Sequence, residues 1–433
     1  MSGIFRFTGA IAALSPADRA ALYCRAGAAD IDVVRCATTA VIARVRDAGD
    51  SALAELAREL DGVTLPSIEI PRERWRAALS TIPPALRLAM ERSARNLRAA
   101  HGAFLPEAME IETEPGVMVG RRPDPIGRVG VYAPGGRATY PSSLLMGAIP
   151  ARVAGVGEVI VCSPPTQPGE PAPVILAAAE LAGVDRVFAV GGAGAIAAMA
   201  YGTRTIPRVD RIVGPGNAYV AEAKLQVASV VGIDSPAGPS ELLVVADRAA
   251  DPEIVAREVM AQAEHDPQAA VVVVAIGAAV ARRIANAIET LAVAQPRHVI
   301  IAESLATRGA LLVAQSVDEA IALVNEWAPE HLLLAIADPA GAFAGVRNVG
   351  TVFFGETSSV VFGDYLTGAN HVLPTGGLAR SYSGLSTMDF VRWTTYQRVD
   401  RVAAGRLAAD AAAFATAEHL PAHAAAAAAW GDT

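Results

Sequence analysis

The chain has 433 residues, of which 52% are hydrophobic and 18% are charged. A chain of this length and composition is expected to be globular with at least two domains, because single cores stop growing at about 250 to 300 residues. The formal net charge of −8, without a long run of Lys or Arg, argues against nucleic-acid or anionic-membrane partners.

The chain contains three cysteines, Cys24, Cys36 and Cys162, without a C-x-x-C spacing. They indicate neither a disulfide framework nor a thiolate metal site. The longest apolar run, 269–281, is too short to span a bilayer, and the N-terminal stretch 7–14 is shorter than the apolar region of a signal peptide. We therefore expect a cytoplasmic protein.

The first part of the chain is predicted to be rich in helices. Apolar residues recur at helical spacing over 29–61, a run that ends at the stop signal Asp61-Gly62, and a second helix is predicted over 84–100. From 127 to 240, short runs rich in Val and Ile alternate with alanine-rich runs. This alternation is typical of a parallel sheet covered by helices.

A second alternating block begins at Leu242 and includes helices over 254–264 and 278–291 with a strand over 271–274 between them. The Pro-, Gly- and Ser-rich segment 235–240 separates the two blocks and is the predicted domain boundary. The sequence therefore predicts two α/β units.

The C-terminal tail from Ala403 to Trp430 is alanine-rich and is predicted to be helical, with a break at Pro421. The tail also contains Glu418 and His423, an acid and an imidazole that an inert helix would not require.

Several short clusters have the composition of a metal-assisted acid/base site. Gln262 and His265 are three residues apart on a predicted helix, so both side chains leave the same face. Taken alone, a Gln-x-x-His pair is a weak signal, and a single His is more often an ordinary surface residue. A ligand set of nitrogen and oxygen without thiolate suits a catalytic or substrate-anchoring zinc ion. The other clusters are Glu330 with His331, Asp364 with His371, and Glu418 with His423.

Glycine-rich loops follow three of the predicted strands, at 132–136, 190–194 and 214–217. The second contains Gly192-x-Gly194-x-x-Ala197, which formally matches a dinucleotide fingerprint between a strand and a helix. Such glycines also occur where the chain only needs a tight bend, so both interpretations stay open on spacing alone.

Six long segments, found in the same order along the chain, are similar to those of histidinol dehydrogenases. The similarity begins at 45–50 and closes with Glu418 and His423, so it runs nearly end to end. The segments are RVGVYAPGGRATYPSSLLMGAIP (128–150), IVGPGNAYV (212–220), AGPSEL (237–242), QAEHDP (262–267), APEHL (328–332) and GDYLTGANHVLPT (363–375).

The resemblance implies an α/β homodimer with two incomplete Rossmann-like parallel-sheet domains and helical extensions at both ends. It implies one Zn²⁺ per subunit and NAD as cofactors, and L-histidinol as a substrate that is oxidised through the aldehyde to L-histidine while two NAD are reduced. The expected division is an N-terminal extension (1–27), a first domain (28–131 with 239–388), an NAD-binding domain (132–238) and a helical tail (389–433) that contributes to the partner's site.

The resemblance also assigns roles to individual residues. Glu330 and His331 correspond to the base and proton-relay pair, and Tyr132, Gly194 and Asn217 occupy cofactor-contacting positions. The implied metal ligands are Gln262, His265, Asp364 and His423, the last from the partner subunit. The implied substrate-contacting residues are Ser240, Gln262, His265, His331, Asp364, His371, Glu418 and His423.

Two positions depart from the family's pattern. Members usually have Gln at the position of Gly194, so NAD binding is expected to be weaker or to use a different loop pose. They usually have a Pro-Glu pair where this chain has Ser359-Val360, which affects recognition of the substrate's ammonium group. These departures leave two alternatives, namely a paralogous zinc- and NAD-dependent dehydrogenase of another small polar alcohol, such as a sulfonated propanediol, and a non-catalytic binding relative.

Overall fold

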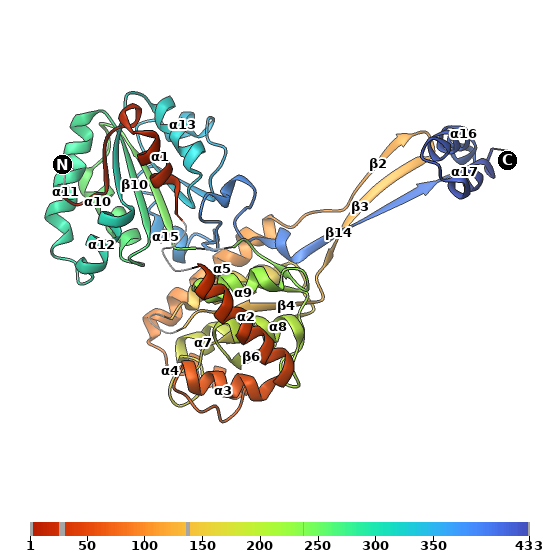
Figure 1. Cartoon of the computed structure of the whole chain (residues 1–433), viewed down its shortest axis with the longest axis horizontal. Helices are drawn as coiled ribbons and strands as arrows, with labels where there is room; N and C mark the ends of the chain where they lie inside the picture. Colours follow the sequence, from red (N-terminus) through yellow and green to blue (C-terminus); the bar gives the residue numbers. More distant parts are fainter. Residues whose placement is uncertain (1–2, 26–30, 136–138, 237, 432–433) are drawn as a thin grey trace.

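Two α/β bodies and a projecting arm make up the chain in the computed structural model, which describes residues 3–25, 31–135, 139–236 and 238–431 (Figure 1). Each body is built on a parallel sheet, and the arm extends from the region where the two bodies meet.

The first body contains a five-stranded parallel sheet in the order β6-β5-β4-β7-β8. Its strands are β4 (Arg128–Tyr132), β5 (Glu158–Ser163), β6 (Arg186–Ala189), β7 (Arg211–Val213) and β8 (Gly232–Ile233). The connecting helices are α6 (Pro141–Val153), α7 (Pro173–Ala182), α8 (Gly192–Tyr201) and α9 (Ala218–Val227). The strand–helix alternation predicted for 127–240 is thus confirmed.

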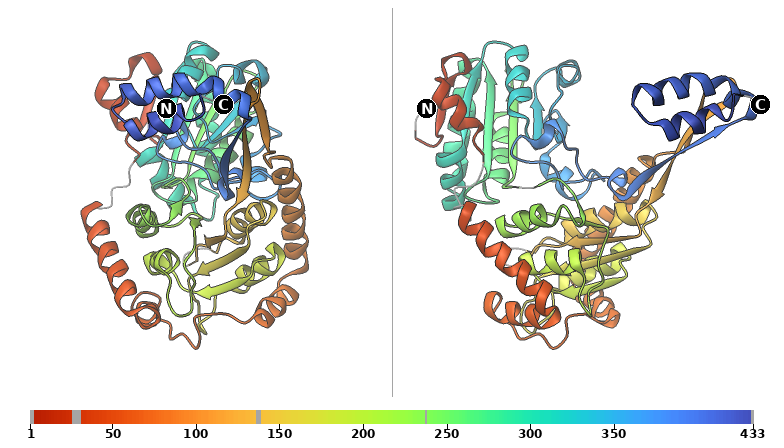
Figure 2. Two further views of the ribbon diagram at one scale, coloured as in Figure 1. Left: turned by 90° about the vertical axis from the view of Figure 1, so that its right-hand side faces the viewer. Right: turned by 45° about the vertical axis from the view of Figure 1, so that its right-hand side comes forward.

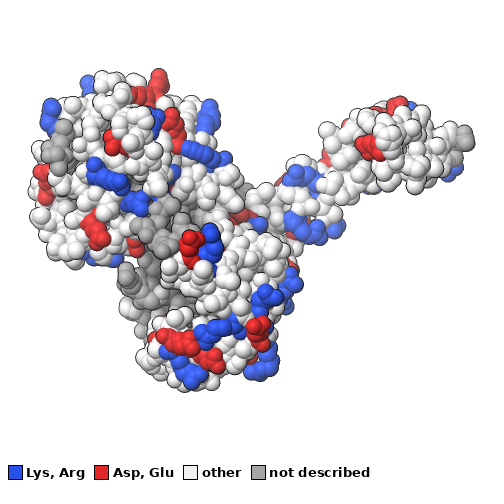
Figure 3. Space-filling model, in the orientation of Figure 1, with Lys and Arg blue, Asp and Glu red and all other residues white. Residues whose placement is uncertain are grey.

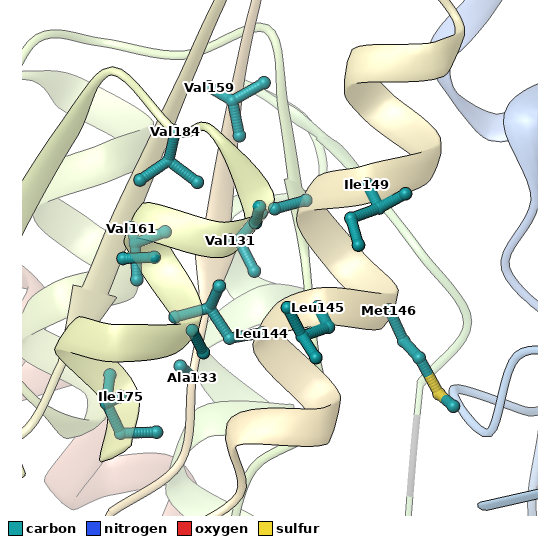
Figure 4. Close-up of a cluster of buried hydrophobic side chains, with 14 of the residues drawn as sticks. Val131, Ala133, Leu144, Leu145, Met146, Ile149, Val159, Val161, Ile175 and Val184 are labelled. Carbon is teal, nitrogen blue, oxygen red and sulfur yellow. The ribbon is translucent and has the colours of Figure 1, made fainter. Parts of the chain in front are cut away.

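Helices on both faces of this sheet explain why its strands are almost continuously apolar. On one face, Val131 and Val161 from the strands meet Leu144 and Ile149 of α6 and Ile175 of α7, all of them fully buried or nearly so (Figure 4).

The second body contains a six-stranded parallel sheet in the order β1-β11-β10-β9-β12-β13. Its strands are β1 (Phe7–Ala10), β9 (Glu241–Ala246), β10 (Ala270–Ile276), β11 (Ala310–Ala314), β12 (His331–Ala335) and β13 (Thr351–Phe354). The helices are α1 (Pro16–Tyr23), α10 (Pro252–Ala263), α11 (Ala278–Ala292), α12 (His298–Arg308), α13 (Val317–Trp327), α14 (Pro339–Phe343) and α15 (Val360–Tyr365), with three 3₁₀ turns, η1 (Ile11–Ala13), η2 (Leu378–Arg380) and η3 (Thr387–Phe390).

The packing of the N-terminal part differs from the expected division. Strand β1 is an integral edge strand of the six-stranded sheet and not a separate extension. Helices α2 (Ile31–Ala48), α3 (Asp50–Leu60), α4 (Arg72–Thr81) and α5 (Pro84–Ala103) share cores with the five-stranded sheet, and the core that contains α4 and α5 also includes Val372 and Leu385. Their apolar faces cover a sheet that comes later in the sequence, a choice of partner that helical spacing does not encode. The helix predicted over 29–61 is split at Gly49, whose φ of +54° permits the turn.

The arm is a three-stranded antiparallel sheet that carries two helices at its tip (Figures 1 and 2). Its strands are β2 (Met109–Glu114), β3 (Val117–Pro125) and β14 (Val391–Val399), and its helices are α16 (Arg401–Ala417) and α17 (Pro421–Ala428). The tail expected to be helical from 389 begins instead with strand β14, because the residues of β14 alternate in VRWTTYQRV and pair with β3, and its helices follow from Arg401. The break at Pro421 is confirmed, since Pro421 starts α17.

The arm exposes an unusual amount of apolar surface. Every residue of β2 is exposed. The large apolar side chains exposed on the arm are Met109, Ile111, Val399, Val402, Phe414, Leu420 and Trp430. On the face drawn in Figure 3, acidic and basic residues intermingle over the two bodies. Within the described ranges, no helix is long and apolar enough to cross a membrane.

Candidate active site at the amino edge of the six-stranded sheet

The acid/base pair lies where the strand order of the six-stranded sheet reverses. The chain runs outward from β9 to β10 and β11, and then returns to place β12 on the other side of β9. Ser240 directly precedes β9, and Glu330 directly precedes β12, whose first residue is His331. Because β9 and β12 are parallel neighbours, these residues meet at the amino ends of the two strands.

A sharp turn before β12 sets the direction of the pair. Helix α13 ends at Trp327, and Ala328 adopts the left-handed conformation with φ of +54°. This conformation is unfavourable for a residue with a Cβ, so the surrounding structure must impose it. Glu330 and His331 are both only 4% exposed.

The backbone of one residue, Glu241, holds both members of the pair. The Glu241 N–H donates to Oε2 of Glu330 at 2.7 Å, and the Glu241 carbonyl oxygen lies 3.0 Å from Nδ1 of His331. A carbonyl oxygen only accepts, so Nδ1 of His331 carries the proton. In the neutral ring, Nε2 then has the free lone pair and can act as a base.

The surroundings of His331 favour its charged form. Burial opposes the charge, but Glu330, whose Oε2 lies 3.4 Å from Nδ1, together with Asp364 and the Glu241 carbonyl, raises the pKa of His331 to about 9. On the other side of the ring, Nε2 lies 3.7 Å from Oδ1 of Asp364. Phe353 stacks on the imidazole with a centroid distance of 6.0 Å.

Asp364 lies on the short helix α15, and His371 holds the backbone of this helix. The Nδ1 atom of His371 is 3.0 Å from the Asp364 carbonyl, and Nε2 is 3.0 Å from Oγ of Ser143 on α6. Burial lowers the pKa of His371, so the ring is neutral, donates from Nδ1 and accepts the Ser143 hydroxyl. Both ring nitrogens are thus engaged within the chain, and His371 connects the two bodies.

Helix α10 brings the Gln-x-x-His pair to the same edge of the sheet. The helix runs antiparallel to the strands that it connects, so its C-terminal end lies near the amino ends of β9 and β10. Gln262 is 5% exposed, and its Nε2 atom has no hydrogen-bond partner among the residues that the structure describes, whereas His265 is exposed.

The carboxylate of Glu258, on helix α10, contacts the backbone at Val360, the position where the sequence lacks an acidic residue. Glu258 lies on α10 four residues before Gln262 and is 6% exposed. Its Oε2 accepts the backbone N–H of Val360, the first residue of α15, at 3.1 Å. Burial raises the pKa of Glu258 although its hydrogen bonds to Ser359 and Val360 oppose this effect. Glu258 therefore ties the helix of Gln262 to the helix of Asp364.

The tail residues are not near this edge in the same chain. Glu418 is the C-cap of α16 and His423 lies on α17, both exposed at the tip of the arm (Figures 1 and 2). In the part of the chain that the structure describes, no three His, Cys, Asp or Glu side chains gather in a way that could hold a metal ion. One protomer thus supplies only part of the predicted ligand set.

The predicted cofactor residues lie at the carboxyl ends of strands in the other sheet. The order β6-β5-β4-β7-β8 reverses between β4 and β7, and such a switch point forms a crevice at the carboxyl edge. Tyr132 ends β4, is 3% exposed and accepts the Gly192 N–H at its hydroxyl. Asn217 follows β7 and caps α9 through its side-chain oxygen. At Gly214, a Cβ atom would lie 2.1 Å from the Tyr132 carbonyl oxygen, so close approach of the two loops requires glycine.

Gly194 occupies a crowded position inside α8. A Cβ atom there would lie 3.3 Å from Cδ1 of Leu56 and 3.5 Å from Cδ2 of Leu53, both on α3. A residue larger than Gly at position 194 would therefore press on α3. This crowding is consistent with the presence of Gly where Gln was expected.

Sequence reasoning missed three residues of the site, Glu241, Glu258 and Ser143. Glu241 lies within the AGPSEL segment, and Glu258 shares a helix face with Gln262, so both could have been found by position. Ser143 lies within the 128–150 segment, but its contact with His371 spans 228 residues of sequence and could not be inferred from that segment alone.

Together, the two parallel sheets and the buried acid–imidazole pair define an α/β enzyme with an acid/base centre. A family model described as histidinol dehydrogenase matches residues 25–429. Histidinol dehydrogenases of Methanothermobacter thermautotrophicus and Methanosarcina barkeri are each 45% identical to this chain over 91% of it, and the matches cover 93% and 90% of their own lengths. The crystal structure of histidinol dehydrogenase from Elizabethkingia anophelis matches with a TM-score of 0.94 at 33% identity, covering 100% of this chain and 99% of that one. The chain belongs to the histidinol dehydrogenase family.

Proposed function

We propose that this protein oxidises L-histidinol to L-histidine through the aldehyde, with reduction of two NAD. The observation that carries the proposal is the attachment of Glu330 and His331 to the backbone N–H and carbonyl of one residue, Glu241. This arrangement supplies an oriented base and a carboxylate side by side, and relatives that are 45% identical are histidinol dehydrogenases.

In the first oxidation, His331 removes the proton of the substrate hydroxyl while hydride leaves the carbon that carries this hydroxyl. The Glu241 carbonyl fixes the proton on Nδ1, so Nε2 is the accepting atom. The base must be neutral to accept a proton. Before the first oxidation, His331 must therefore lose the Nε2 proton of its charged form, which its surroundings favour.

The second oxidation begins with an aldehyde, which must add water before it can lose hydride. Glu330 accepts the proton of this water with the oxygen that does not bind the Glu241 N–H. Its burial excludes bulk water from the pair and keeps the carboxylate oriented toward His331.

The side chains at the sheet edge fit a divalent metal ion. Gln262 is buried at this edge and would bind an ion through its amide oxygen, and an amide oxygen, an imidazole and a carboxylate together suit Zn²⁺. Gln262, His265 and Asp364 would hold the ion, together with His423 of the partner subunit. When bound, the metal would supply a template that anchors the substrate's nitrogen atoms and polarises them.

NAD would bind at the switch point of the five-stranded sheet, between the loops that follow β4 and β7. When bound, it would supply the hydride acceptor for both oxidations. Tyr132 and Asn217 would shape this crevice, with the Tyr132 hydroxyl supporting the Gly192 loop.

The functional unit would be a homodimer in which the arms are exchanged. The exposed apolar side chains of the arm require a partner surface, and the arm carries Glu418 and His423 away from its own body. An arm that packs on a second subunit would bring both residues to that subunit's site. The free state of all three cysteines suits the reducing cytoplasm in which we expect the protein to act.

A second candidate substrate is favoured by one observation, the presence of Val360 in place of an acid. A paralogous dehydrogenase of a sulfonated propanediol would not need a carboxylate that recognises an ammonium group. The test is a panel of alcohols with the zinc-loaded protein, scored by NADH formation and by identification of the acid. Formation of L-histidine from L-histidinol supports the proposal, whereas turnover of the sulfonated alcohol alone would replace it.

A further inference from the structure

The backbone of Glu241 orients both catalytic side chains, so whatever holds Glu241 controls the geometry of the pair. The side chain of Glu241 is itself held at both oxygens. It also lies near Glu330: in addition to burial, the charge of Glu330 raises the pKa of the Glu241 carboxyl, whereas a backbone hydrogen bond from Glu330 lowers it. Oε2 accepts from Nη1 of Arg25 at 2.6 Å, and Oε1 accepts from the Gly376 N–H at 2.7 Å. The side chains of Arg25 and Glu241 are only 6% and 2% exposed.

Arg25 is fixed as firmly as the carboxylate that it binds. It donates through Nη2 to the carbonyl of Trp327, and its guanidinium lies 4.0 Å from the centroid of the Trp327 ring. The Trp327 indole N–H donates in turn to the carbonyl of Leu22 on α1. Trp327 ends α13 just before the turn into β12. Arg25 therefore connects the start of β9 with the turn that precedes Glu330.

Stability alone does not explain this pair. Taking two charges out of water costs roughly what their attraction returns, so a buried ion pair contributes little net stability. Burial raises the pKa of Glu241 to about 7 while Arg25 opposes this shift, so loss of Arg25 would favour protonation or movement of the carboxylate. Either change would shift the Glu241 backbone, whose N–H and carbonyl contact Glu330 and His331.

We propose that Arg25 and the side chain of Glu241 are positioning residues that hold the Glu241 backbone in place. Through this contact, the N-terminal segment that contains Arg25 controls the orientation of His331 and Glu330. The inference rests on the roles proposed above for those two residues. Neither Arg25 nor the Glu241 side chain touches the reacting atoms in this account, and both act through the Glu241 main chain.

The test compares R25M, R25K and E241Q in the zinc-loaded full-length protein. We expect R25M to lower kcat for L-histidinol at least about tenfold while KM changes little, because a small misplacement of a base slows the reaction without weakening binding. R25K keeps the charge and should recover part of kcat. The matched control is R19M, in the same N-terminal segment, which removes the surface ion pair between Arg19 and Glu326. This variant should leave kcat unchanged.

A second readout requires no substrate. The Nδ1 proton of His331, buried and hydrogen-bonded to the Glu241 carbonyl, should give a downfield NMR resonance that is absent from H331N. In R25M and E241Q this resonance should shift or broaden, while in R19M it should stay in place. If R25M does not fold, the nearly isosteric E241Q decides the question.

An unchanged kcat and an unchanged His331 resonance in folded R25M, or in E241Q, would overturn the inference. If the wild-type protein does not oxidise L-histidinol, the proposed function fails, but the resonance still reports whether Arg25 and Glu241 orient His331. The two failures are therefore distinguishable.

Discussion

Nε2 of His331 lies 3.7 Å from Oδ1 of Asp364, so the candidate base faces a side chain that would bind the metal. Asp364, a proposed metal ligand, and the candidate base therefore share one electrostatic environment but belong to different elements, α15 and β12. This separation allows the two roles to be removed one at a time.

Replacing His331 by Asn should slow the first hydride transfer by about 10² to 10⁴, the range by which general bases accelerate reactions. Zinc content should be unchanged, because His331 is not among the proposed ligands. Pre-steady-state NADH formation and metal analysis measure the two effects. H298N is a matched control, since His298 is exposed and its ring contacts the nearby Gln295 carbonyl, away from the candidate site. A wild-type rate in H331N would remove the residue from its role.

Loss of the carboxylate at Glu258 should weaken zinc binding. E258Q reduces the acceptor strength at the N–H of Val360 and loosens α15 relative to α10, and changes of this kind typically cost 10- to 100-fold in metal affinity. Competition with a fluorescent chelator gives the Kd for zinc. E253Q, an exposed change on the same helix, should bind zinc as the wild type does. Equal affinities in E258Q and E253Q would contradict the proposed link between the two helices.

Mixing two inactive variants should restore activity if the tail completes the partner's site. In a heterodimer of H331N with H423A, one site contains both changes and the other contains neither. Random exchange of subunits should then return about a quarter of the wild-type activity, since about half of the dimers are mixed and each has one intact site. If His423 served its own chain, no site would be intact and the mixture would stay inactive.

His101 should make the protein sensitive to acid. It is 2% exposed, both ring nitrogens lack hydrogen-bond partners among the described residues, and burial lowers its pKa to about 4. Because the folded-state pKa lies below the unfolded value of 6.5, its stabilising effect is complete above pH 6.5 and is lost as the pH falls toward 4. The free energy of unfolding should therefore drop by about 3 kcal/mol over this range on account of His101.

Urea unfolding at pH 7 and pH 4 measures the effect. In H101L, which keeps an apolar group in the buried site, the pH dependence of stability should be smaller by the same amount. An identical pH dependence in H101L and in the wild type would show that His101 does not carry this sensitivity.

The elements of both sheets could be predicted from the sequence because their signals are local. Strands such as Val129–Tyr132 and helices such as 254–264 follow from apolar runs and helical spacing, and the structure contains both within a few residues. The partners of the N-terminal helices could not be predicted, because helical spacing defines an apolar face without naming the sheet that it covers. The arm was missed because β2 is exposed at every residue and its strand signal was weak.

The site was predictable where residues lie in long motifs and unpredictable where contacts span the fold. Glu330, His331 and Gln262 belong to motifs, and the structure brings them to one edge of the sheet. The contact of Arg25 with Glu241 joins residues that are 216 positions apart, and no local pattern connects them.

The central claim is a four-electron oxidation, and the most direct test is the NADH yield from limiting L-histidinol with excess NAD. The account predicts about two NADH per L-histidinol for the zinc-loaded wild type, with activity lost on chelation and restored by zinc. E330Q, which removes the proton acceptor for the second step, should release the aldehyde after about one NADH. One NADH or none from the folded, zinc-loaded wild type would contradict the account.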